Sequence, residues 1–145
     1  MKRRTKNPTA WAQAIAASRP MEPSVADEAL ARLHSAFADL RSGSTDDEIF
    51  DRVAMAINTG MVRAEQIDEL CVQPMLAARD ALLRCDAIRG RNGHYGFDGP
   101  GLQAMVAGLE VYEEMLRKSS PAQMQEAMRV SIHRMRQQRA QEAQQ

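Results

Sequence analysis

Hydrophobic side chains recur along most of this chain at spacings of three and four residues, which is the period of an amphipathic α-helix. The first such segment is Thr9–Ser18, where Trp11 and Ile15 lie one turn apart before Pro20 and Pro23 interrupt the pattern. No stretch shows sustained alternation with β-branched residues, so no β-sheet is expected. The pattern predicts an all-α fold, a single-domain bundle of five or six helices.

Two longer helices are predicted in the first half of the chain. One runs from a Ser24 cap to about Arg41, and its apolar stripe consists of Val25, Ala29, Leu33, Phe37 and Leu40. The next begins at Thr45-Asp46-Asp47-Glu48, a capping box in which the Thr45 hydroxyl accepts from the Glu48 amide. Its inward face consists of Ile49, Phe50, Val53, Ala54 and Ile57, and Gly60 marks a stop or a kink.

The second half of the chain begins with another helical turn or two at 63–72. Because proline is tolerated near the start of a helix, Pro74 places the next helix from about Gln73 to Ile88. Its core candidates are Leu76, Leu82 and Leu83.

The most regular heptad follows residue 101. Leu102, Met105, Leu109, Tyr112 and Leu116 repeat at spacings of 3-4-3-4 and are expected to face a partner helix. Ser120 and Pro121 then begin a last helix as its cap and first residue. The two or three C-terminal helices are expected to pack antiparallel and to form the tightest unit of the bundle.

Composition narrows the classes of function. The 19 basic and 19 acidic residues cancel, so net charge attracts neither nucleic acid nor an anionic membrane. Basic residues gather at the ends: residues 1–8 are expected to form a flexible basic arm, residues 9–136 the helical domain and residues 137–145 a frayed polar tail. No apolar run is long enough to span a membrane. Cys71 and Cys85 lie too far apart on one helix for a disulfide, which favours a cytoplasmic protein.

Residues 89–101, RGRNGHYGFDGPG, contain five of the eight glycines and leave two interpretations open. In the first, the stretch is a corner: Gly90 ends one helix, Asn92-Gly93 makes a turn, and Asp98 or Gly99 caps the next helix. In the second, it is a ligand-binding loop, although no strand precedes it and no phosphate-loop motif is present. The ligand contacts would then be Arg89, Arg91 and His94.

Ten methionines suggest a surface that adapts to a partner. Five of them gather in the last two helices, and together with an aromatic residue of the heptad they form the predicted partner interface. Its members are Met105, Tyr112, Met115, Met124, Met128 and Met135. The same spacing also suits a helix core, so both interpretations stay open.

Two features suit a nucleic-acid-binding protein. Ala56, Gly60 and Ile67 form an imperfect helix-turn-helix pattern, although acidic residues at 65, 68 and 69 would be repelled by phosphates. The basic stretch HRMRQQR, with Arg134 and Arg136, could grip a nucleic-acid backbone or could be a solvated tail.

Catalytic chemistry is not indicated. His34, His94 and His133 lie too far apart in sequence to form a helical metal-binding pair, and no nucleophile lies beside a base. We therefore predict no enzymatic activity, no metal and no cofactor.

The runs GFDGPGLQAMVAGLEVYEEMLRKSSPAQMQEAM and AINTGMVRAEQIDELC resemble a group of short bacterial proteins carried by prophages and other mobile elements, over roughly residues 25–135. Some members of that group are labelled Fis-like transcriptional regulators. The resemblance implies a phage or mobile-element accessory protein, a setting compatible with an inhibitor of host defence. It implies no mechanism and no site residue.

These observations predict a non-enzymatic helical protein-interaction module that forms a homodimer and binds a protein partner of unknown identity. The alternative is a nucleic-acid-binding transcriptional regulator.

Overall fold

The structure is a computed structural model that describes residues 20–145, and this part of the chain is all-α, with five helices and no strand. The helices are α2 (Pro23–Arg41), α3 (Asp47–Ile67), α4 (Glu69–Asn92), α5 (Gly99–Lys118) and α6 (Pro121–Ala143). The predicted fold class is confirmed. The expected basic arm at 1–8 and the helix expected at Thr9–Ser18 lie outside the described residues.

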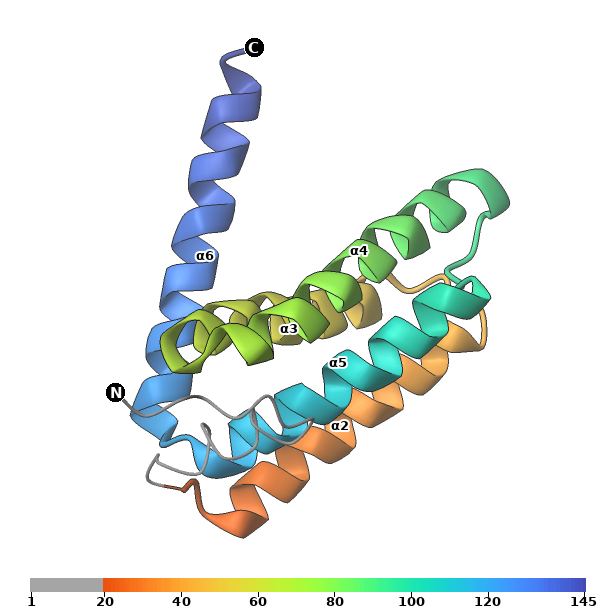
Figure 1. Ribbon diagram of the computed structural model, residues 1–145. Coiled ribbons are helices and arrows are strands. Elements are labelled where there is room, and N and C mark those ends of the chain that lie inside the picture. Colours follow the sequence, from red (N-terminus) through yellow and green to blue (C-terminus); the bar gives the residue numbers. More distant parts are fainter. Residues whose placement is uncertain (1–19) are drawn as a thin grey trace.

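The helices α4 and α5 form an antiparallel hairpin that lies against α2 and α3 (Figure 1), and they make the most extensive contact of any two described helices. They approach closely at Gly108, where a Cβ atom would lie 2.5 Å from the Cβ of Ala78. The predicted apolar edge of α5 faces inward. Met105, Leu109 and Leu116 are buried, and Leu102 and Tyr112 are half-buried.

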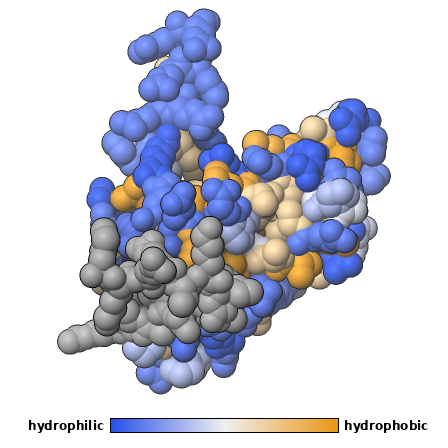
Figure 2. All heavy atoms as spheres, in the orientation of Figure 1, coloured by the Kyte–Doolittle hydropathy of each residue, from blue (hydrophilic) through white to orange (hydrophobic). Residues whose placement is uncertain are grey.

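The last helix, α6, leaves this arrangement. It packs across α3 and then projects away from the other helices (Figure 1), so the antiparallel C-terminal pair is α4 with α5. Residues 137–143 are helical, where the sequence predicted a frayed tail, but all their side chains are exposed. Figure 2 shows this end of the molecule as predominantly hydrophilic.

Side chains at four of the described helix starts, those of α3 to α6, bind the first free amides. Ser120 caps α6, as predicted, and Asp98, one of the two residues predicted as the cap, caps α5. The cap of α3 is Asp46 and not Thr45, because the helix begins one residue later than expected and the Asp46 carboxylate accepts from the Glu48 amide at 2.9 Å.

The first part of α2 turns a different face inward than predicted. The helix begins at Pro23, without a Ser24 cap. Val25 is 52% exposed, whereas Ala26 and Leu30 are buried. The reason is that these two residues continue the four-three spacing of the buried side chains that follow, which are Leu33, Phe37 and Leu40.

Two residues at which the sequence analysis placed the boundary of a helix or a kink lie inside helices. Gly60 lies within α3, where a Cβ atom would come 2.6 Å from Met75 Cε and 2.9 Å from Tyr112 Cδ2, so glycine serves close packing and not a turn. Pro74 lies within α4. The boundary between α3 and α4 lies instead at Asp68, a single residue with an extended backbone whose carboxylate accepts a hydrogen bond from the Leu70 amide.

Within α4, Leu82 is buried and Leu76 half-buried, but the predicted core residue Leu83 is 63% exposed. Cys71 and Cys85 are free and buried on its inward face. Burial is the main cause that raises the pKa of the Cys71 thiol to about 11, and burial also raises the pKa of Cys85. Both sulfurs are therefore protonated thiols at neutral pH.

Candidate functional site

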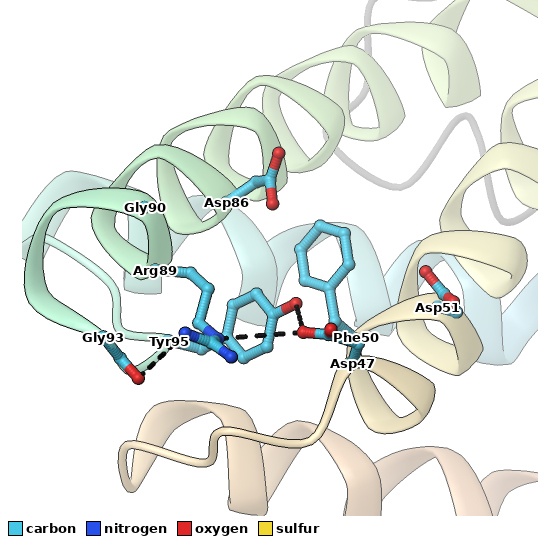
Figure 3. Close-up of a pocket in the computed structure, with 8 residues that line it drawn as sticks. All are labelled: Asp47, Phe50, Asp51, Asp86, Arg89, Gly90, Gly93 and Tyr95. Carbon is cyan, nitrogen blue, oxygen red and sulfur yellow. Dashed lines mark hydrogen bonds and ion pairs between the residues drawn. The ribbon is translucent and has the colours of Figure 1, made fainter.

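The glycine-rich stretch is the corner between α4 and α5. Side chains of this corner contact side chains of α3 (Figure 3). The helix α4 continues past Gly90 and ends at Gly93, whose φ of 81° is in the left-handed region that favours glycine. Tyr95 then packs on α3: its hydroxyl donates to Asp47 at 2.6 Å, and its ring stacks on Phe50 with 4.8 Å between the centroids. Burial and this hydrogen bond raise the pKa of Tyr95.

Arg89, a predicted ligand contact, is engaged in the same corner. Its guanidinium donates to the carbonyl oxygens of Gly93 at 3.0 Å and Thr45 at 3.4 Å. Its Nε lies 3.7 Å from Asp47, and its Cζ lies 5.7 Å from the centroid of the Tyr95 ring. The charge of Arg89 and the donors on its two terminal nitrogens therefore hold the corner against α3, although its Nε has no hydrogen-bond partner within the described residues.

The other two predicted ligand contacts, Arg91 and His94, are exposed. His94 Nδ1 lies 3.0 Å from the carbonyl oxygen of Tyr95. An open depression of about 760 Å³ lies at this corner, but neither residue lines it; its wall carries Asp51 and Asp86 besides Asp47. Carboxylates there repel an anion, and the nearby arginine is occupied, so the geometry favours the structural interpretation of the stretch.

The six residues of the predicted partner interface separate into three places. Met105 and Met115 are fully buried in the core. Met135 lies in a small cleft beside α3. Tyr112, Met124 and Met128 line one groove together, which we call the Thr59 groove.

The Thr59 groove has a volume of about 430 Å³ and is lined by four helices. The lining residues are Ala29, Arg32 and Leu33 from α2, Arg52, Met55, Ala56 and Thr59 from α3, Tyr112 and Leu116 from α5, and Met124 and Met128 from α6. Each helix contributes residues three or four positions apart and therefore one continuous face. The walls are mainly apolar, and Met128 is 43% exposed.

Thr59 is the exceptional polar group of this groove. It is 3% exposed, and its hydroxyl has no hydrogen-bond partner within the described residues. A buried hydroxyl without a partner costs about 1–3 kcal/mol. Burial also raises the pKa of Tyr112, whose phenol is therefore neutral at physiological pH.

Arg63, one turn after Thr59 on α3, connects this groove to the start of α6. It is 5% exposed, and its Nε donates to Ser119 Oγ at 2.9 Å. Because Ser119 is the residue that ends α5, the contact ties α3 to the turn from which α6 departs. Burial lowers the pKa of the Arg63 guanidinium, which nevertheless stays charged.

Sequence reasoning missed Arg52, Met55 and Thr59. Together with Ala56 they share one face of α3, at helical spacing, apart from the core face that carries Val53. This second face was the available signal. The stop or kink predicted at Gly60 hid it, because a helix that is interrupted there offers no continuous face toward Arg63.

The features that suggested nucleic-acid binding also look different in the structure. Ala56, Gly60 and Ile67 lie in the single helix α3, so the helix-turn-helix prediction is wrong. Arg134 donates to both carboxylate oxygens of Glu65 at 3.0 and 2.8 Å. Arg136 is exposed on the projecting part of α6.

Within residues 20–145, no group of three or more histidine, cysteine, aspartate or glutamate side chains is placed to hold a metal ion. A search of the same residues finds that none of the helices combines the length and apolar character of a membrane span.

No protein-family model matches this chain, and no curated protein and no solved structure matches it either.

Proposed function

We propose that this protein is a non-enzymatic helical interaction module that binds a partner protein in the Thr59 groove. The observation that carries the proposal is an apolar groove with a deeply buried hydroxyl that lacks a hydrogen-bond partner. A volume of about 430 Å³ lies within the range of binding clefts, which combine apolar walls with a few placed polar groups.

The composition of the walls favours a protein partner. Met55, Met124 and Met128 provide flexible, polarisable side chains of the kind that adapt to a partner's surface. Faces whose residues lie three or four positions apart suit a helix that inserts apolar anchors at the same spacing. Three of the six interface residues predicted from the sequence line this groove, which supports the same conclusion.

The experiment compares two arginine substitutions on a tagged full-length chain purified from its native host. Met128→Arg places a charge in the groove, and Leu83→Arg is the matched control on α4, where the native side chain is 63% exposed. We expect a protein that co-purifies with the native chain and with the Leu83 variant to be lost from the Met128 variant. Equal retention by both variants, each verified as folded by circular dichroism, would contradict the proposal.

The homodimer, the cytoplasmic location and the accessory role in a phage or mobile element are further proposals. The last of these, including inhibition of host defence, depends on the resemblance noted from the sequence. Light scattering tests the dimer: the expected mass is twice the 16.1 kDa of the chain, and a monomer at tens of micromolar would refute it.

A nucleic-acid-binding regulator is the second candidate, and one observation favours it. Arg136 and Arg139 are exposed on the projecting end of α6, and within the described residues neither forms an ion pair. Binding through such residues weakens steeply as salt rises. A gel-shift titration at low salt tests this candidate; no shift, or a shift unchanged by Arg136→Glu with Arg139→Glu, would reject it.

A further inference from the structure

The charged residues that line the Thr59 groove are all positive. They are Arg32 from α2 and Arg52 from α3, and none of the described residues that line the groove is acidic. Both arginines are exposed. An occupant with carboxylates on the two sides that face α2 and α3 would therefore meet a cation on each of these helices.

The two arginines differ in their contacts within the molecule. The side chain of Arg52 forms no ion pair within the described residues. Arg32 contacts the Glu28 carboxylate at 2.6 Å, but the two side chains of this pair are 70% and 67% exposed. An ion pair this exposed holds its members weakly, so a carboxylate of a bound protein can replace that of Glu28 at little cost.

The wall that α3 provides has the length of two helical turns. Its lining residues run from Arg52 to Thr59, which corresponds to a rise of about 10 Å along the helix axis. Apolar anchors at positions i, i+3, i+4 and i+7 of a docked helix repeat over the same distance. Met55 and Met128 provide flexible side chains that adapt to such anchors. The groove therefore fits an amphipathic helix that carries acidic residues beside its apolar stripe.

A second copy of this chain does not offer such a helix among its described residues. The large apolar side chains that are exposed there are Val25, Leu70, Leu83, Val106 and Met128. No two of them lie three or four positions apart, so none of the described helices presents a pair of large exposed anchors on one face. The spacing therefore favours a different protein as the occupant.

We propose that the occupant of the Thr59 groove is an amphipathic helix of another protein, with acidic residues that pair with Arg32 and Arg52. The inference rests on the proposed function and deepens it, because it names the chemistry of the partner at the same site. Each exposed ion pair changes a binding constant by about 1.4- to 5-fold, and a like-charge contact acts by a similar factor in the opposite direction. Basic residues in place of the acidic ones should therefore weaken binding by at least about 4-fold.

Two synthetic helical peptides of about 18 residues serve as the probe. Both carry leucine at the anchor positions, and the positions beside the anchors are glutamate in one peptide and lysine in the other. Fluorescence anisotropy of the labelled peptides measures their affinity for the full-length chain. We expect the glutamate peptide to bind at least about 4-fold more tightly than the lysine peptide. Its affinity should fall as sodium chloride rises from about 50 mM to about 500 mM.

Two charge reversals test whether the groove arginines cause this preference. Arg52→Glu turns one attraction into a repulsion, so it should weaken binding of the glutamate peptide roughly 2- to 30-fold and strengthen binding of the lysine peptide by a similar factor. Arg91→Glu makes the same change of charge at an exposed residue outside the groove and should leave both affinities unchanged.

A second measurement uses the native chain and does not depend on a variant that folds. Bound glutamate peptide should shift the NMR amide resonances of Met55 and Met128 and leave that of Leu83 unchanged. Equal affinities for the two peptides, no saturable binding of the glutamate peptide, or resonances of the groove that ignore it would overturn the proposal. An effect of Arg91→Glu as large as that of Arg52→Glu would also overturn it. So would a peptide affinity that falls as the chain concentration rises, because a second copy would then occupy the groove.

The two proposals can fail separately. If the glutamate peptide shows no preference while Met128→Arg still abolishes co-purification of a partner, the acidic helix is refuted and the binding module stands. If the glutamate peptide binds as expected but no protein co-purifies in a groove-dependent manner, the proposed function is refuted and the preference of the groove stands. If both stand, the glutamate peptide should displace the co-purified protein from the native chain.

Discussion

Replacement of Gly108 by alanine tests the packing that positions one wall of the groove. Gly108 lies one turn before Tyr112 on α5, at a close approach to α4. The added Cβ would lie 2.5 Å from Ala78 Cβ and 3.3 Å from the Pro74 carbonyl oxygen. Non-bonded carbon atoms prefer about 3.5–4.0 Å, so the helices would have to separate by roughly 1 Å.

Two opposite effects decide the outcome. Alanine favours a helix over glycine by about 0.8–1.0 kcal/mol, whereas overpacking of a core costs about 1–3 kcal/mol. Because Ala78 Cβ and the Pro74 carbonyl are fixed to the backbone of α4, no side-chain rotation relieves the contact, and overpacking should prevail. We expect a net loss of roughly 1–2 kcal/mol and a melting temperature lower by about 2–8 °C.

The control is Gly90→Ala, also inside a helix, where nothing lies within 4 Å of an added Cβ. It should stabilise the protein by up to about 1 kcal/mol. Thermal unfolding followed by circular dichroism measures both variants. In the double variant Ala78→Gly with Gly108→Ala, the methyl group moves from one helix to the other, so the coupling energy should be about 1–3 kcal/mol. If Gly108→Ala stabilised the protein as much as Gly90→Ala, the packing argument would be refuted.

Three further predictions follow from named contacts. Tyr95→Phe removes the 2.6 Å hydrogen bond to Asp47 and should lower the free energy of unfolding, measured in urea, by about 1–3 kcal/mol. Folding also raises the Tyr95 pKa above the ordinary 10.0, so the native protein should lose stability as pH rises above that value. This loss should be smaller in the variant, which has no phenol to titrate. Asp98→Asn should flatten the loss of stability in acid. The hydrogen bonds from Arg84 and from the Gly101 amide lower the Asp98 pKa, so their contribution to stability disappears as pH falls below the ordinary 3.8 and through the lower folded-state value. Urea midpoints measured from about pH 2 to about pH 5, a range that extends at least about one unit to each side of the ordinary pKa, should converge for the two proteins at the acid end. Cys71 and Cys85, buried and with raised pKa values, should react with a disulfide reagent at pH 8 only at the rate at which the protein opens, so prompt reaction in the native state would contradict their burial.

The periodic patterns identified much of the core of the bundle, although they wrongly included Val25 and Leu83. The heptad of α5 and the caps Asp98 and Ser120 depend on residues close in sequence, so local reasoning found them. Gly60 and Pro74 were misread because their local preferences yield to packing between helices. A glycine that accommodates Tyr112 and Met75 has the same sequence signature as a glycine that ends a helix.

The candidate site was predicted only in part for a related reason. Tyr112, Met124 and Met128 stood out as adaptable apolar side chains, and the structure brings them to one groove. Met105 belongs to the same stripe but is fully buried. Spacing alone does not distinguish a methionine in the core from one that lines the groove. A helix that lies between the core and the groove is apolar on both faces. Thr59 carried no signal, since a threonine is unremarkable until its hydroxyl is buried.

The direction of α6 explains why the groove as a whole escaped prediction. Arg63 and Ser119 are polar residue types that sequence patterns assign to the surface, yet both are buried and bonded at 2.9 Å across 56 positions of sequence. A buried guanidinium needs hydrogen-bond acceptors, and Ser119 provides one of them, which favours the contact between the end of α3 and the turn before α6. Once they meet, Met124 and Met128 pass over the face of α3 that carries Thr59, and the fourth wall of the groove is complete. Contacts between residues so far apart in sequence, such as Arg63 with Ser119 and Arg134 with Glu65, leave no periodic trace in the helices that line the groove.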